Sequence, residues 1–175
     1  MVRFQRQPPG TAITRSALLV GGAATAAGAW LIVADSPRVG GYVAAAAASL
    51  LLVGGHRANH GAGGPVDRML TELLDRAWDG AILGAVVWES GASGWASVAA
   101  IVALAASYLS SYVRARGAAL GYSIEESHVT RGSRYALVTS ALITGGTWLI
   151  GVAALLSVLA ALVRVSQIAS EERAA

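Results

Sequence analysis

The chain has 175 residues, of which 55% are hydrophobic and only 13% are charged, and its formal net charge at neutral pH is +3. Soluble domains usually contain about 25% charged residues, so this composition excludes an ordinary water-soluble domain and indicates a membrane protein. The chain has no cysteine, which excludes disulfide bonds and thiolate metal sites.

Long apolar segments follow one another along the chain and predict an all-α, polytopic membrane protein, a six-transmembrane-helix bundle. About 20 apolar residues in a helix cross roughly 30 Å of hydrocarbon. Gly145 and Gly146 divide the last apolar run, which is too long for one span, into two helices. The expected spans are residues 17–34, 40–55, 67–88, 95–113 and two helices within 133–168. Before them lies a cytoplasmic or interfacial segment, and after them a cytoplasmic tail, so the expected divisions are 1–16, 17–168 and 169–175.

All 13 basic residues are arginines, and their placement predicts the orientation in the membrane. If the N-terminus is cytoplasmic, eleven arginines fall on that side, Arg38 falls on the opposite side and Arg76 lies within the third span. Cytoplasmic loops carry an excess of arginine and lysine, so both termini are expected on the cytoplasmic side of a bacterial-type inner membrane. The scattered arginines suit anionic lipid headgroups and do not indicate a nucleic-acid surface.

Three carboxylates lie close together in the third apolar segment, those of Glu72, Asp75 and Asp79. Residues three and four apart share one face of a helix, so these side chains are expected to converge. Ionisable groups inside a membrane are costly and usually mark function, and carboxylate oxygens are the ligands that Mg²⁺ prefers. The alternative is that the acids lie at the headgroup boundary and pair with Arg68 and Arg76. A weaker third idea is an ion or proton pathway through the same carboxylates.

Four arginines lie near the expected cytoplasmic ends of the fourth and fifth spans. Guanidinium groups match the oxygens of phosphate, so these side chains are candidates for binding a phosphate group. The alternative is the ordinary excess of arginine on the cytoplasmic side, which alone explains arginines here. The four residues are Arg114, Arg116, Arg131 and Arg134.

Two histidines four residues apart, His56 and His60, follow the second apolar segment. They could bind a metal ion together if the second helix continued that far. Glycine and asparagine nearby favour a loop instead, which would separate the two rings.

Three short segments resemble the motifs of one family of membrane enzymes, the CDP-alcohol phosphatidyltransferases. Residues 73–83 resemble the second half of the family signature, which reads D-x2-D-G-x2-A-R-x8-G-x3-D-x3-D. Residues 111–121 resemble the segment S-Y-x-[RK]-A-R-A-E-x-L-G at the end of the family's fourth span. Residues 130–134 stand where the family often has an E-R-x-x-R-like element. Two motifs in the same order and at the right separation are more specific than either alone.

The resemblance implies a reaction in which an alcohol displaces CMP from a CDP-linked lipid during phospholipid synthesis. It implies Mg²⁺ or Mn²⁺ held by Asp75 and Asp79, with Asp79 as the general base. Glu72, one turn earlier on the helix, is a further candidate ligand from its spacing alone. It implies that an acceptor phosphate meets Arg114, Arg116, Arg131 and Arg134. It also implies a homodimer that contacts membrane lipid, the lipid donor and the alcohol acceptor.

The first half of the signature is absent from this chain. Counting back from Asp75 places its two aspartates at Gly54 and Arg57, and no Asp or Glu occurs between Asp35 and Asp67. An arginine in a metal position repels the cation. Two functions therefore stand beside each other: a transferase with a remodelled site, or a catalytically inactive homologue that binds lipid or a partner protein. In the remodelled site, the replacement ligands would be Glu72, Asp67 or the histidines, His60 among them.

Overall fold

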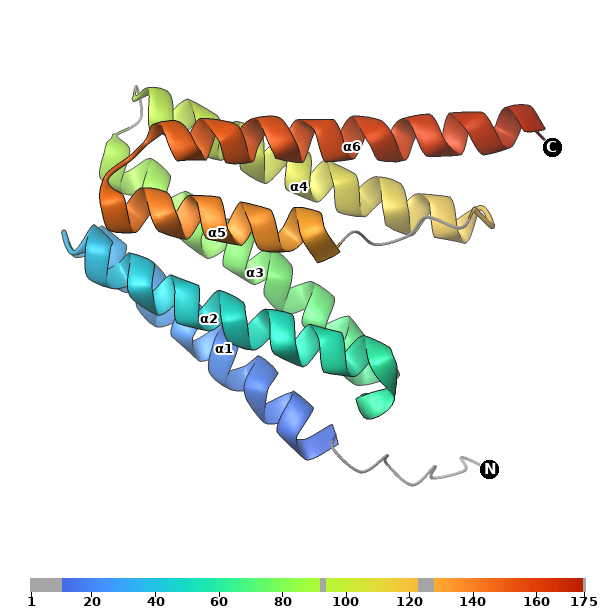
Figure 1. The fold of residues 1–175 in the computed structure, drawn as a ribbon, viewed down its shortest axis with the longest axis horizontal. Helices are drawn as coiled ribbons and strands as arrows, with labels where there is room; N and C mark the ends of the chain where they lie inside the picture. Colours follow the sequence, from blue (N-terminus) through green and yellow to red (C-terminus); the bar gives the residue numbers. More distant parts are fainter. Residues whose placement is uncertain (1–10, 92–93, 123–127, 175) are drawn as a thin grey trace.

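The structure is a computed structural model, and it describes residues 11–91, 94–122 and 128–174. Within these ranges the regular structure is entirely helical, which confirms the all-α prediction, and it comprises six α-helices with a short π-helix after the second (Figure 1). The helices are α1 (Thr11–Val33), α2 (Pro37–Arg57), the π-helix (Ala58–Ala62), α3 (Pro65–Ser90), α4 (Trp95–Ala119), α5 (His128–Thr144) and α6 (Trp148–Ala174).

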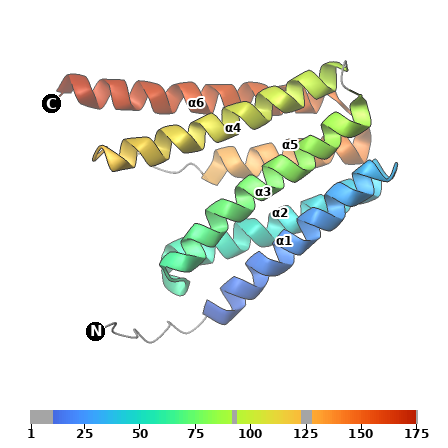
Figure 2. The ribbon, with the colours of Figure 1, turned by 180° about the vertical axis from the view of Figure 1, so that it is seen from behind.

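The helices form two groups that α3 joins. Helices α1 and α2 form an antiparallel hairpin, α4 and α6 lie side by side, and α5 lies between α2 and α6 (Figures 1 and 2). Helix α3 contacts α1 and α2 in one group and α4 in the other. A polar residue on the inner face of α3 is therefore placed between both groups.

The hairpin of α1 and α2 depends on very close backbone contact. Asp35 takes a positive φ of 58° in the turn, and Pro37 starts α2 at a position where a missing N–H costs nothing. A Cβ added at Gly40 would lie 2.8 Å from the backbone oxygen of Gly28, closer than real Cβ atoms come. In lipid, small residues of this kind let helices approach each other, because hydrophobicity does not drive their association.

Four helices are long and apolar enough to cross a membrane: α1, α2 with its extension to Gly61, α4 and α6. Six spans were expected, so the structure supports four of them by length and composition. Helix α3 has 26 residues but carries charged side chains, among them Asp75, Arg76 and Asp79. Helix α5 has 17 residues, about 25 Å at 1.5 Å per residue, and carries Arg131 and Arg134.

The expected segments correspond to the six helices, with differences at their ends. Gly145 has a positive φ of 74° and separates α5 from α6, so the predicted division of the last apolar run is confirmed. The loop favoured from His56 to His60 begins later than expected, because the chain stays helical to Asn59 and the non-helical angles fall at His60 and Gly61. The connection expected over 117–132 is shorter than predicted, and residues 123–127 of it lie outside the described part. Residues 11–16 begin α1, and residues 169–174 continue α6.

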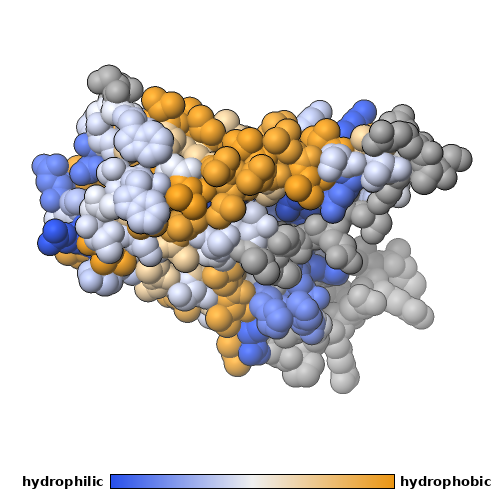
Figure 3. Space-filling model, turned by 45° about the horizontal axis from the view of Figure 1, so that its top comes forward, coloured by the Kyte–Doolittle hydropathy of each residue, from blue (hydrophilic) through white to orange (hydrophobic). Residues whose placement is uncertain are grey.

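Much of the surface and most of the core between the helices are apolar, as expected for a chain with candidate membrane spans. Trp78, Leu18, Ile82 and Leu51 are fully buried between the helices. In Figure 3 a continuous hydrophobic area crosses the middle of the visible face, and hydrophilic side chains gather toward its two ends. The other four tryptophans are exposed, and they lie where α1 and α3 finish and where α4 and α6 begin: Trp30, Trp88, Trp95 and Trp148. These helix ends lie together at one end of the bundle, a distribution typical of an interfacial aromatic belt (Figure 1).

Candidate functional site: an arginine-lined cavity

Helix α3 carries three buried aspartates, one in its first turn and two further along. Gly64 caps the helix and Pro65 is its first residue. The carboxylate of Asp67 accepts a hydrogen bond of 2.9 Å from the Gly64 N–H, so this backbone donor at the start of the helix has a partner. Further along, Asp75 is 1% exposed and Asp79 is fully buried. A buried carboxylate is stable only when charged or hydrogen-bonding partners compensate it, so the partners define what this site is.

Asp79 is held by three side chains from three helices. The guanidinium group of Arg134 donates from Nε to Oδ1 and from Nη2 to Oδ2, each at 2.9 Å. Ser107 donates its hydroxyl to Oδ2 at 2.5 Å, and Nη1 of Arg76 lies 3.0 Å from the same oxygen. The bidentate arginine pair is the strongest form of this contact, and it uses both carboxylate oxygens.

Asp75 is held mainly from α5. The Tyr135 hydroxyl donates to Oδ1 at 2.8 Å, and Nη1 of Arg131 lies 2.6 Å from Oδ2. The contact with Arg131 is an ion pair, and Oδ2 accepts no hydrogen bond from the described residues. The ring centroids of Tyr135 and the buried Trp78 lie 4.1 Å apart. This packing holds the Tyr135 ring in place beside the Asp75 carboxylate. The alternative pairing of the acids with Arg68 and Arg76 is therefore realised only between Arg76 and Asp79.

Glu72 does not join the other two acids in the interior. Its side chain is 55% exposed, and its Oε1 lies 3.2 Å from Nη1 of Arg114 on α4. Within the described part of the chain, no group of three or more His, Cys, Asp or Glu side chains is placed to hold a metal ion. The structure thus brings each of the three predicted carboxylates to an arginine, and it brings only Asp75 and Asp79 into the core.

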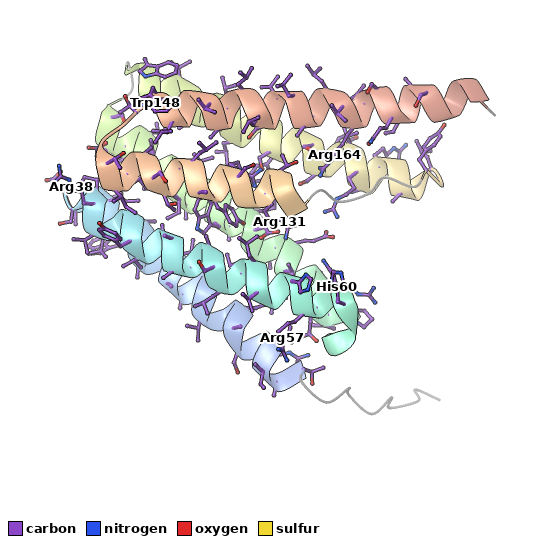
Figure 4. All side chains as sticks on the ribbon, in the orientation of Figure 1. Arg38, Arg57, His60, Arg131, Trp148 and Arg164 are labelled. Carbon is purple, nitrogen blue, oxygen red and sulfur yellow. The ribbon has the colours of Figure 1, made fainter. Side chains whose placement is uncertain are left out.

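Beside the aspartates lies a small cavity of about 30 Å³ between α3, α4, α5 and α6. Its lining is basic and hydroxyl-rich, and none of the described residues that line it is acidic. Figure 4 shows Arg131 and Arg164 in this region, on neighbouring helices. The lining residues are Arg76, Arg114, Arg131, Arg134, Arg164, Ser107, Ser110, Ser111, Ser157, Thr130 and Ala160. We call this space the arginine cavity.

Helix α4 holds two of these arginines through its serines. Nη1 of Arg76 donates to the Ser107 backbone oxygen at 3.0 Å and also contacts the Ser107 hydroxyl. Nη1 of Arg164 donates to the Ser110 backbone oxygen at 3.0 Å and to its hydroxyl at 2.6 Å. Because 107 and 110 are one turn apart, a single face of α4 orients arginines from α3 and α6.

A second, more open cavity of about 320 Å³ adjoins the first. The two share Arg76, Arg114, Arg131 and Ser111 as a common wall. The second cavity adds the acids Glu72 and Asp75 and the exposed aromatic side chains Tyr108 and Tyr112. A group that enters through the open cavity therefore meets the arginines at its inner end.

The predicted phosphate-binding residues are only partly brought together. Arg114, Arg131 and Arg134 line the arginine cavity, whereas Arg116 is exposed and lines neither cavity. Sequence reasoning did not place Arg76 and Arg164 in this site. The signal for Arg76 was a charged residue inside an apolar segment, the pattern that usually marks function in membranes.

The other candidate ligands have their own partners. Asp67 is buried and forms an ion pair with Arg15 of α1, whose Nε lies 2.9 Å from Oδ1. His60 hydrogen-bonds through Nδ1 to the His56 backbone oxygen at 2.9 Å, and the two rings stack with centroids 4.1 Å apart. Neither Asp67 nor His60 lines either of the two cavities.

Comparison with known proteins assigns no family to the chain. The sequence matches no protein-family model and no curated protein. Its function therefore has to be inferred from the arginine cavity and from the residues around it.

Proposed function

We propose that this is an integral membrane protein that binds a phosphate-bearing lipid in the arginine cavity. In this proposal it is a catalytically inactive homologue of the CDP-alcohol phosphatidyltransferases with six membrane-crossing helices. The observation that carries the proposal is an enclosed cavity whose lining supplies five guanidinium groups and four serine hydroxyls. Guanidinium groups bind phosphate oxygens in a planar, often bidentate arrangement. The Ser107 and Ser157 hydroxyls already donate, to Asp79 and to the Ala153 backbone oxygen, so the arginines are the main donors.

Charge balance supports an anionic ligand. Among the described residues, five arginines (Arg76, Arg114, Arg131, Arg134 and Arg164) and three acids (Glu72, Asp75 and Asp79) stand around the two cavities, an excess of two positive charges within this part of the chain. Arginines in the interior of a membrane protein are costly unless they are paired. A phosphate group supplies the missing negative charge.

The position of the cavity along the bundle supports a lipid as the source of that phosphate. The exposed tryptophans mark one end of the bundle, and the arginines of α4, α5 and α6 lie toward the other. By the positive-inside rule, the arginine end faces the cytoplasm, with both termini on that side of the inner membrane. A cavity at that level can receive a phospholipid headgroup while the acyl chains stay in the bilayer.

Binding of short-chain phosphatidic acid to the purified protein, measured by titration calorimetry, tests the proposal. We expect Arg134→Gln to weaken binding about tenfold or more, because it removes charged hydrogen-bond donors from the cavity. Arg38→Gln is the matched control, since Arg38 is exposed at the opposite end of the molecule (Figure 4). Equal weakening in both variants, or no binding by the unchanged protein, would contradict the proposal.

The transferase remains a second candidate, favoured by the two collinear motifs and by the open cavity beside Asp75. In this reaction an alcohol oxygen would bond to the β-phosphorus of CDP-diacylglycerol, the bond to CMP would break, and the hydroxyl proton would pass to a base such as Asp79.

Release of CMP, measured with Mg²⁺ or Mn²⁺ and a panel of alcohols, distinguishes the two candidates. Metal-dependent release that disappears in Asp79→Asn would establish an enzyme. No release from a folded protein, with phosphatidic acid still bound, supports the inactive homologue. The same preparation shows by its size whether the protein is a homodimer.

A further inference from the structure

We infer that the arginine cavity binds its phosphate group without a divalent cation, because guanidinium groups of the chain itself occupy the carboxylates that a metal ion would need. This inference rests on the proposed function, since it concerns how the same cavity takes its anion. It also assigns a role to Asp75 and Asp79: they are positioning residues that hold arginines toward the ligand.

The contacts of Asp79 leave no room for a metal ion. Both of its oxygens accept from Arg134, and Oδ2 also meets Ser107 and Arg76. Mg²⁺ binds oxygen at about 2.0–2.1 Å in near-octahedral geometry, so it would have to displace these groups. The displaced Arg134 is buried and would lose the anionic partner that compensates its charge.

The contacts of Asp75 also leave no place for a metal ion. Its Oδ2 accepts no hydrogen bond from the described residues, which would suit a metal ligand, but Nη1 of Arg131 already lies 2.6 Å from that oxygen. A divalent cation on Oδ2 would therefore stand beside a fixed positive charge. Like charges at such a separation repel strongly where water is scarce. The residues present do not fit the metal ion that the family resemblance implies.

The charge excess around the cavities has the wrong sign for a metal site. Sites that hold Mg²⁺ have acids in excess, and the cation balances them. Among the described residues around the cavities the arginines exceed the acids by two charges, and a divalent cation would double that excess. A phosphate group with two negative charges balances it directly, so a phosphate monoester is the ligand class that this count favours.

The two aspartates give the arginines a fixed geometry. Arg134 uses Nε and Nη2 on Asp79 and lines the cavity with the same guanidinium group. A guanidinium group has more N–H donors than the two that hold the carboxylate, so it can bind an anion at the same time. The carboxylate thus orients the donor group before the ligand arrives, which lowers the entropic cost of binding.

The test measures binding of inorganic phosphate to the purified protein in phosphatidylcholine nanodiscs. Calorimetric titrations are run in EDTA, in Mg²⁺ and in Mn²⁺. We expect the dissociation constant to agree within about twofold in all three buffers, and to rise about tenfold or more in Arg134→Gln and in Arg114→Gln. Arg38→Gln serves as the unchanged control. Nanodiscs that also contain phosphatidic acid show whether the lipid headgroup takes the same site, because it would then exclude inorganic phosphate.

Each outcome decides between specific alternatives. Phosphate binding that appears only with Mg²⁺ or Mn²⁺ overturns the metal-free inference and leaves the anion-binding function standing. Absence of phosphate and phosphatidic acid binding in every buffer overturns both. A direct readout is the paramagnetic resonance of Mn²⁺, which we expect to remain that of the free ion. A bound signal that is lost in Asp79→Asn would also overturn the inference, and Glu89→Gln, at an exposed acid of α3 that lines neither cavity, is its matched control.

Discussion

Arg134 and Asp79 show how strongly two residues in this interior depend on each other. Both are buried, and two hydrogen bonds of 2.9 Å join them. Ser107 and Arg76 complete the coordination of the carboxylate, so the pair belongs to a network with members on α3, α4 and α5. Removing one member leaves a charge without its partner in a region of low dielectric, which costs more than the pair contributes.

A double-mutant cycle on this pair is the prediction at the scale of residues. We expect Asp79→Asn and Arg134→Gln each to lower the free energy of unfolding by about 3–5 kcal/mol, because each removes the bidentate partner of a buried charge. The double variant should lose less than the sum of the two, by about 1–3 kcal/mol, since it contains neither member of the bidentate pair. Unfolding in mixed micelles with increasing SDS measures all four proteins. Strict additivity would contradict the paired geometry.

The sequence indicated these two acids and left their partners open. The spacing of Asp75 and Asp79 on a helix predicts that their side chains share one face. Their contacts with α5 join residues 55 and 60 positions apart in the chain, as between Arg134 and Asp79 and between Tyr135 and Asp75. Such pairs depend on how α3 and α5 cross, and local spacing carries no information about that crossing.

At the scale of helices, the length of apolar runs and the glycine pair at 145–146 were sufficient to find the elements. The end of α2 was harder, because Asn59 and Gly61 favour a turn. The chain stays helical to Asn59, and the turn falls at His60 and Gly61, whose backbone angles are non-helical. Gly61 takes a positive φ of 97°, a conformation that glycine adopts readily. The chain then packs closely on itself, since a Cβ at Gly63 would lie 2.7 Å from the Cα of Ala58.

The prediction at the scale of helices concerns the close contact between α1 and α2. Gly40→Ala should lower the free energy of unfolding by about 1–3 kcal/mol, because the new methyl group meets the backbone of α1 at Gly28. Gly84→Ala on α3 is the control. A Cβ there meets nothing within 4 Å, so this variant should be neutral or gain up to about 1 kcal/mol in helix stability. Equal unfolding curves for the two variants would mean that the hairpin does not depend on this contact.

At the scale of the whole molecule, the distribution of tryptophan and arginine defines two ends. Four exposed tryptophans gather where α4 and α6 begin, and the arginine cavity lies toward the end where α5 begins. Such a separation matches a bilayer with the arginine end at the cytoplasmic surface. In this orientation the open cavity beside the arginines would lie near headgroups and water, which would lower the cost of the buried arginines.

The orientation can be measured directly because the natural chain has no cysteine. Single cysteines introduced as Arg38→Cys and Ser170→Cys occupy exposed positions, one in the first turn of α2 and one near the end of α6. The positive-inside distribution predicts that a membrane-impermeant maleimide labels the first in intact cells and the second only after the inner membrane is opened. The unchanged chain should take no label in either condition. Labelling of both cysteines from the same side would mean an even number of crossings between them and would contradict this orientation. Labelling of Ser170→Cys alone in intact cells would invert the bundle and place the arginine cavity on the outer side, away from any cytoplasmic phosphate ligand.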